Sequence, residues 1–476
     1  MQINEFKGKR KLGYCSGIIT ESLLYNMFYT YYLVFLTDVI KMDPLLAGTV
    51  SFISIIWDAV TDPIIGSFAD RNGADKRRFM GKAAFPLGIL FVAAFINIHT
   101  ESPVVQFIYY TAVAMLFWLA YTIYTIPYYA VVAEITQDYD ERTEIRSTSS
   151  LINTAAIFLG NALPAVLPSL FAGLVLSGKK MGNSFGWTLT ALIMALMSIA
   201  FALITVKSLK GVRLQKAEAE ADTTDRKNVK EIFSEFFEVL KIKPFKWFAM
   251  FIVFFLMASS MIQSSFEYMI KDLVGAEPET WMTVVIIELV VIMALFIPVV
   301  TKIAEKKDRR FSSILFMSVM CVGLIVLRFI GVRTIPAVLA VTFFMAMGMA
   351  NFWTVFYSMA YDLVEVDEFA YNSRRESVIT ALPQFFQKFG AAVGVWTVSL
   401  ILKVTGYDGK LSVQSSDSVN GIENIVTVFP AVFLMLSVLG AVLYPVTREK
   451  FNKLTQELEK KRNGEKYSSD GLEKLV

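Results

Sequence analysis

The chain has 476 residues, of which 55% are hydrophobic, 14% are aromatic and only 18% are charged. Soluble domains carry about 25% charged residues, so this composition argues against a soluble protein. The formal net charge of +3 gives no support to nucleic-acid binding. With two cysteines and a single histidine, His99, the chain lacks the residues for a disulfide framework, a metal centre or a nucleophile–base pair. We therefore expect neither an enzyme nor a bound cofactor.

Apolar runs recur along the whole chain at the length that a helix needs to cross a bilayer, which is about 20 residues. The twelve expected spans fall near residues 14–37, 45–69, 79–98, 104–134, 149–175, 185–207, 247–270, 280–304, 312–331, 335–362, 377–403 and 424–446. The sequence therefore predicts an all-α polytopic protein of the lipid bilayer with twelve transmembrane helices.

Basic residues indicate which loops face the cytoplasm. Lys and Arg cluster in residues 7–11, 71–82 and 302–310, whereas the loops at 38–44 and 97–103 carry one Lys and none. The positive-inside rule then places both termini in the cytoplasm, in a multi-pass protein of the cell membrane. The charged N-terminal residues and the first span are not followed by a cleavage site, so no removable signal peptide is expected.

A long charged stretch between the sixth and seventh spans divides the chain into halves. The halves look like repeats, because "KRRF" at 76–79 after the second span corresponds to "DRRF" at 308–311 after the eighth. Two parallel six-helix repeats resemble the layout of the major facilitator superfamily. We expect an N-terminal six-helix bundle at 1–207, a cytoplasmic linker at 208–246, a C-terminal six-helix bundle at 247–447 and a flexible cytoplasmic tail at 448–476.

Charged residues in the cytoplasmic loops are candidates for a gate. The loop after the second span reads G-x-x-x-D-R-x-G from Gly66 to Gly73, which resembles the loop motif of that superfamily. Its charges can pair with helix ends at the cytoplasmic side, although plain positive-inside anchoring would use the same residues. The expected gating residues are Asp70, Arg71, Arg78, Arg142, Arg309 and Arg310.

Two carboxylates interrupt the second apolar span, at Asp58 and Asp62. A carboxylate at the centre of a membrane helix costs roughly 2.5–3.5 kcal/mol, and residues four apart lie on one helix face about 6 Å apart. Two such charges in a medium of low dielectric constant require a proton or a cation between them, and oxygen ligands suit hard cations such as Na⁺. Pro63 frees the carbonyl of Ala59 as a further candidate ligand. The alternative is that both acids pair with basic side chains and only hold helices together.

Three motifs together resemble one family of transporters. They are "WDAVTDP" at 57–63 with its basic loop, "AYDLVEVDEFAYNSRRESVITALPQFFQKFGAAVG" at 360–394, and "FLTDVIKM" at 35–42. They resemble the glycoside–pentoside–hexuronide:cation symporters, a melibiose permease-like family with the major facilitator fold. The resemblance implies two six-helix bundles around a central cavity that holds both a sugar and a cation.

The resemblance also implies a cation site formed by Asp58, Asp62 and Thr122. Thr61 stands where the family has an Asn that bears on the cation accepted. Both Na⁺ and H⁺ therefore stay open as the transported cation.

The sugar site departs from the family pattern. Ser22, Thr125 and Ser150 stand where the family has two Asp residues and an Arg that bind galactoside hydroxyls, and losing such charged partners changes the ligand. As a cation deep in a span, Lys388 is expected to pair with the acids of the second span or with Glu288. Polar and aromatic side chains at helical spacing line the expected cavity. The expected substrate-binding residues are Glu21, Ser22, Tyr25, Asn26, Thr125, Tyr129, Trp353, Gln384 and Lys388.

These patterns favour a secondary symporter in which an inward gradient of Na⁺ or H⁺ drives uptake of a small sugar by alternating access. We expect it to work as a monomer. One alternative is a cation-coupled transporter of an amphiphile such as a lysolipid, which the lost charged anchors and the many Phe and Tyr residues would fit. A membrane sensor that transports nothing is the other alternative.

Overall fold

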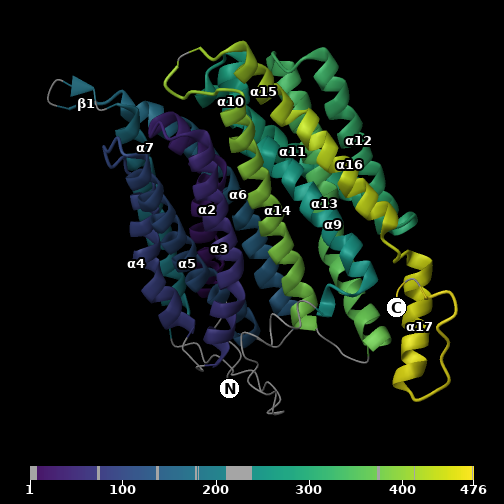
Figure 1. Cartoon of the computed structure of the whole chain (residues 1–476). Helices are drawn as coiled ribbons and strands as arrows, with labels where there is room; N and C mark the ends of the chain where they lie inside the picture. The colour runs from purple at the N-terminus through teal and green to yellow at the C-terminus, as the bar shows by residue number, and fades with distance from the viewer. Residues whose placement is uncertain are drawn as a thin grey trace. The chain divides into compact units, whose positions relative to one another are not determined.

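The computed structural model of the chain describes residues 8–71, 76–135, 139–176, 179–180, 182–210, 238–371, 376–411, 413–473 and 475. The chain divides into two compact units, which are both helical (Figure 1). Unit 1 comprises Met1–Asp225, Glu277–Ile286 and Leu402–Gln414. Unit 2 comprises Arg226–Ala276, Ile287–Ile401 and Ser415–Val476. The division between Asp225 and Arg226 falls within the expected linker, of which residues 211–237 lie outside the described part of the chain.

Unit 1 is built from long antiparallel helices joined by short loops. A small hairpin of β1 (Val175–Leu176) and β2 (Lys179–Lys180) connects its last two long helices, and is the one departure from the all-α expectation in the described residues. The helices are α1 (Lys9–Cys15), α2 (Gly17–Val34) with its π-helical end (Phe35–Val39), α3 (Pro44–Arg71), α4 (Lys76–Ala94), α5 (Pro103–Ile135), α6 (Tyr139–Ala172) and α7 (Asn183–Ser208).

Unit 2 contains the helices of the second half of the chain. The first nine residues of α11 and the last three of α14 are assigned to unit 1, while the rest of both helices lies in unit 2. The helices are α9 (Lys243–Ser264), α10 (Phe266–Tyr268) with a π-helical turn (Met269–Val274), α11 (Pro278–Lys306), α12 (Arg309–Ile330), α13 (Ile335–Tyr371), α14 (Glu376–Val404), α15 (Ser416–Val426), α16 (Val428–Leu443) and α17 (Arg448–Arg462).

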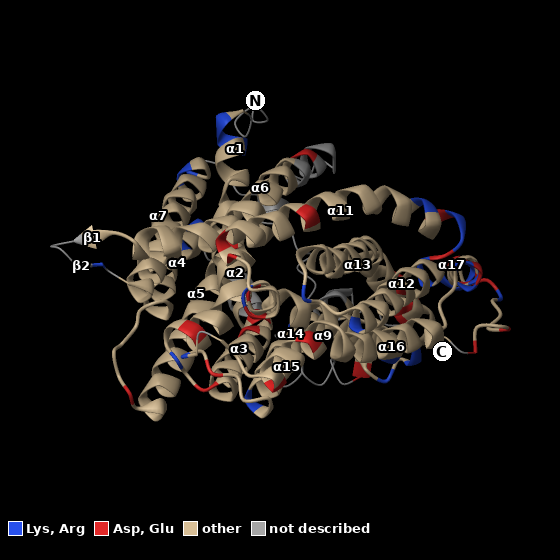
Figure 2. Cartoon of the chain, turned by 90° about the horizontal axis from the view of Figure 1, so that it is seen from above, with Lys and Arg blue, Asp and Glu red and all other residues tan. Residues whose placement is uncertain are grey.

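The expected spans coincide with these helices. In the described part of the chain, ten helical segments are long and apolar enough to cross a membrane. The two expected spans that fall outside this set are α2, which carries Glu21 and Asn26, and α4, which begins with basic residues. Most of the ribbon carries no charged residue, and charged residues are frequent around α17 (Figure 2). The prediction of an all-α polytopic membrane protein is confirmed.

Local sequence signals fix several helix ends in unit 2. Asp308 caps α12 by accepting a hydrogen bond from the backbone N–H of Arg310, and Ser415 caps α15 in the same way. Gly331, with φ of 91°, ends α12 in a conformation that side chains with a Cβ rarely adopt. Such caps satisfy the free backbone groups at helix ends.

The expectation that the tail from Arg448 is flexible is wrong. Residues Arg448–Arg462 form α17, which packs against the end of α13. Leu454 and Leu458, four residues apart, form a buried apolar stripe on this otherwise charged helix. Arg462 adds a two-pronged ion pair with Glu368 of α13, with nitrogen–oxygen distances of 2.7 and 2.5 Å. A short apolar stripe among many charges is easily overlooked in a sequence, which explains the error.

Candidate functional site

The two acids of α3 meet a hydroxyl of α5 inside unit 1. Asp58 is only 2% exposed, Asp62 is half-buried, and Thr122 is fully buried. The Thr122 Oγ1 atom lies 2.9 Å from Asp58 Oδ1 and 3.0 Å from Asp62 Oδ1. Three oxygen atoms from two helices thus converge at one buried point.

The single hydroxyl hydrogen of Thr122 cannot serve both of its short contacts. A threonine hydroxyl has one hydrogen, so Thr122 can donate to Asp58 or to Asp62 but not to both at once. The other short contact then brings an oxygen lone pair against a carboxylate, which a cation or an additional proton would relieve. No group of three or more His, Cys, Asp or Glu side chains suited to a metal ion occurs among the described residues. The oxygen set instead suits a hard monovalent ion or a proton.

The same helix α5 carries candidate substrate-binding residues beside the acid site. Thr122, Thr125 and Tyr129 follow the i, i+3, i+7 spacing of one helix face, and Thr122 and Tyr129 are about 10 Å apart along the axis. The Tyr129 hydroxyl donates to Glu21 Oε2 on α2 over 2.6 Å. Tyr121, buried and one residue before Thr122, has its ring centroid 6.3 Å from that of Tyr25 of α2. The acid site and the Glu21–Tyr129 pair are therefore near neighbours.

Asparagines of α6 connect to the polar side of α2. The Asn26 side chain donates to the carbonyl of Ser22 over 2.8 Å and accepts from Asn161 Nδ2 over 3.1 Å. The Ser22 hydroxyl donates to Asn153 Oδ1. A Cβ on Gly160 would lie 2.9 Å from the Ser22 carbonyl oxygen, so glycine permits this close approach of the two helices. Sequence reasoning missed Asn153, Asn161 and Gly160, although two amides within an apolar span were a signal.

The expected substrate-binding residues divide between the units. Glu21, Ser22, Tyr25, Asn26, Thr125 and Tyr129 lie together in unit 1, whereas Trp353, Gln384 and Lys388 belong to unit 2. Tyr25 is 37% exposed and stacks on Tyr29 at a centroid distance of 5.5 Å. Trp353 and Gln384 are exposed, and Lys388 is half-buried. Glu288, the alternative partner of Lys388, has a buried Oε2 atom with no hydrogen-bond partner among the described residues.

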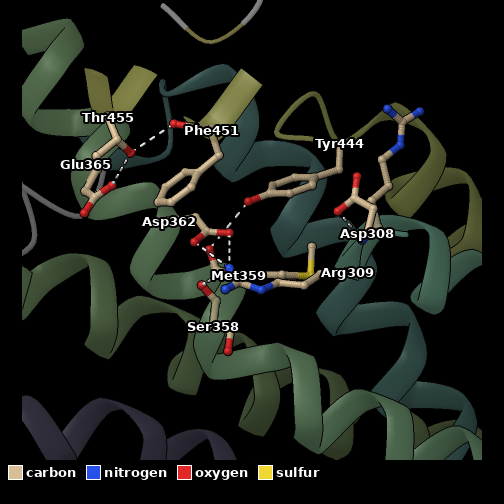
Figure 3. A network of polar contacts seen from close by, with 10 residues as sticks. Asp308, Arg309, Ser358, Met359, Asp362, Glu365, Tyr444, Phe451 and Thr455 are labelled. Atoms are coloured by element: carbon tan, nitrogen blue, oxygen red, sulfur yellow. Dashed lines mark hydrogen bonds and ion pairs between the residues drawn. The ribbon is translucent and has the colours of Figure 1, made fainter. Parts of the chain in front are cut away.

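One of the expected gating residues, Arg309, forms an ion pair that the sequence analysis did not predict. Arg309 Nη1 lies 2.6 Å from each carboxylate oxygen of Asp362 of α13 and 3.3 Å from the Ser358 carbonyl oxygen (Figure 3). Tyr444 donates to the carbonyl of Met359 over 3.5 Å beside this pair. These side chains line a cavity of about 400 Å³ between α11, α13 and α17.

The other expected gating residues are less informative. Arg310 donates to the carbonyl of Val442, and Arg78 is exposed. The side chains of Asp70, Arg71 and Arg142 lie outside the described residues.

The two helical units have the fold of major facilitator transporters. The structure is similar to that of a D-xylose–proton symporter, with a TM-score of 0.63, 15% identity, and coverage of 92% of this chain and 95% of that chain. The chain belongs to the MFS/sugar transport protein family, whose profile matches residues 13–448. It is a melibiose permease-like symporter of the major facilitator superfamily, as the three motifs predict.

Two curated relatives match along nearly the whole chain. The uncharacterized symporter YnaJ of Bacillus subtilis is 26% identical over 456 residues, which cover 94% of each protein. The isoprimeverose transporter of Lactiplantibacillus pentosus is 24% identical over 461 residues, which cover 94% of this chain and 91% of the relative.

Proposed function

We propose that this chain is a symporter that couples inward movement of Na⁺ or H⁺ to the uptake of a small sugar. The observation that carries the proposal is the placement of Thr122 Oγ1 between the carboxylates of Asp58 and Asp62. A buried acid pair with a third oxygen ligand suits a small cation, and ionisable side chains at this depth in a membrane commonly mark ion or substrate pathways. The isoprimeverose transporter among the relatives supports a sugar as the second ligand.

Coupling follows from the position of both sites on α5. A cation at the acid pair neutralises the repulsion between Asp58 and Asp62 and fixes Thr122. Because Thr125 and Tyr129 stand on the same helix face, a shift of α5 at one site alters the geometry of the other. Each ligand then strengthens the binding of the other by the same factor, since coupling free energies are reciprocal.

The remaining elements serve alternating access. In this proposal the Arg309–Asp362 pair holds the cytoplasmic end of unit 2 in one of its arrangements. We place both termini in the cytoplasm of the cell, because the basic residues cluster in the corresponding loops. The cation is transported with the substrate, and no other cofactor is required.

The test is uptake of labelled glycosides, pentosides and uronides in cells that express the chain. Each sugar is measured with and without Na⁺ and with and without a proton gradient, beside the variant Asp58→Asn at matched expression. We expect one sugar class to accumulate against its gradient with one cation, and the variant to lose accumulation while it still exchanges substrate. If Asp58→Asn accumulates sugar as well as the wild type does, the acid pair is not the coupling site.

A further inference from the structure

A row of three aromatic side chains runs along α13 in unit 2. Trp353, Tyr357 and Tyr361 are spaced four residues apart and are 39%, 45% and 56% exposed. At a rise of about 1.5 Å per residue, this aromatic row extends over about 12 Å of the helix.

The aromatic row is held in place by a second, buried row on the same helix. Phe352 and Phe356 are 0% and 1% exposed. The Trp353 ring meets Phe352 edge-on at 5.3 Å and 82°, and the Tyr357 ring meets Phe356 at 4.9 Å and 80°. Phe352 in turn stacks on Phe255 of α9 at 4.5 Å. Such edge-to-face contacts fix ring orientation, so the Trp353 and Tyr357 rings are already ordered before any ligand arrives.

The composition of the exposed face distinguishes the aromatic row from a lipid-facing stripe. Between Asn351 and Asp362, the side chains that are not buried are those of the aromatic row together with Thr354 and Ser358. Not one of them is Leu, Ile, Phe or Val, the residues whose insertion into a bilayer is most favourable. Rings with a polar tip, alternating with hydroxyls, match the apolar faces and hydroxyl groups of a sugar.

The length of the aromatic row carries information about the ligand. A single pyranose ring covers one aromatic face, and a monosaccharide would therefore use one of the three rings. A row of about 12 Å has room for two or three sugar rings in line.

Building on the sugar symport proposed above, we propose that the aromatic row is a stacking track that selects glycosides with more than one sugar ring. The preferred substrate is then a disaccharide or short oligosaccharide. Trp353 stacks on one ring, and Tyr357 and Tyr361 determine specificity by stacking on the next.

A substrate length series tests the aromatic row. Uptake of a monosaccharide methyl glycoside, the matching disaccharide and the trisaccharide is measured for the wild type, Tyr357→Ala, Tyr357→Phe and Tyr361→Ala. The control is Phe329→Ala, which removes an aromatic side chain of α12 that is 86% exposed. We expect each Ala variant of the row to raise KM for the longer sugars by about tenfold. KM for the monosaccharide and all values for Phe329→Ala should stay unchanged, and Tyr357→Phe should behave like the wild type.

Different failures have different meanings. If the Ala variants affect sugars of every length equally, or affect none of them, the aromatic row does not select longer glycosides. The proposal of sugar symport then remains. The absence of accumulation of every sugar in the wild type overturns sugar symport itself, and the aromatic row with it.

Cysteine labelling supplies a second measurement that does not require transport. Both native cysteines, Cys15 and Cys321, are buried, so a water-soluble maleimide should report mainly on Tyr361→Cys. We expect labelling at this position, and protection by the disaccharide at lower concentrations than by the monosaccharide. A position that does not react with the hydrophilic reagent, or that sugar does not protect, contradicts a stacking track.

Discussion

The Arg309–Asp362 ion pair gives a quantitative prediction about unit 2. The carboxylate of Asp362 is 8% exposed and receives one guanidinium nitrogen at 2.6 Å from both of its oxygens (Figure 3). The change Arg309→Ala leaves this carboxylate buried without its counter-charge. For a fully buried pair the cost of such a change is about 3–5 kcal/mol.

Solvent reduces this cost. The Arg309 side chain is 41% exposed, and exposed ion pairs contribute about 1 kcal/mol or less. We therefore expect Arg309→Ala to lower the free energy of unfolding by about 2 kcal/mol. For a unit of about 200 residues this corresponds to a fall in Tm of roughly 4–8 °C.

The assay is thermal unfolding of the purified protein in detergent, with Arg310→Ala as the matched control. The Arg310 guanidinium donates to a backbone carbonyl, that of Val442, and its loss leaves no buried carboxylate unpaired. The double variant Arg309→Met, Asp362→Asn should recover most of the lost stability, because it removes both charges. The pair does not stabilise unit 2 as argued if Arg309→Ala has the same Tm as Arg310→Ala. The same holds if the double variant has a Tm as low as that of Arg309→Ala.

Three further predictions concern the acid site, the helix contact and the tail. If Na⁺ is the coupling cation, Thr122→Val should raise the Na⁺ concentration for half-maximal uptake by about tenfold, while Thr190→Val, whose buried hydroxyl bonds its own helix, should not. Gly160→Ala should weaken substrate binding and lower Tm, because its Cβ would press on the α2 backbone; an unchanged Kd would show that the helices separate freely. The Lys460 ammonium lowers the pKa of Glu457 below its usual range, so this contact persists above the ordinary glutamate pKa and is lost as the pH falls through the lowered value. Hydrogen-exchange protection of α17, corrected for the intrinsic pH dependence of amide exchange, should then fall at acid pH, and protection that does not change with pH would contradict this.

The features that could be predicted from the sequence are those that depend on the spacing of residues within a single helix. Asp58 and Asp62 stand out because any charge within an apolar run is conspicuous, and their spacing alone places them on one face. Thr122 came only from the family resemblance, since a threonine in a membrane helix gives no signal of its own. In the structure Thr122 contacts Asp62, which lies 60 positions away in the chain.

Contacts between helices were the part that the sequence did not reveal. Asn161 and Asn26 pair across 135 residues, and Arg309 and Asp362 across 53. Each of these side chains has many sterically acceptable partners, and only the packing of the helices decides among them. The docking of α17 was missed for a related reason, because two leucines become an apolar stripe only when a surface is present to receive them.

The single helix α5 links two properties that selection would otherwise treat separately. Thr122 touches the acid pair, and Tyr129, two turns further on, touches Glu21. If the acid pair binds the coupling cation as proposed, a mutation that repositions α5 to admit a new sugar will also change cation binding. Laboratory evolution toward a new substrate should therefore recover variants with an altered ion preference, even where no residue of the acid pair has changed.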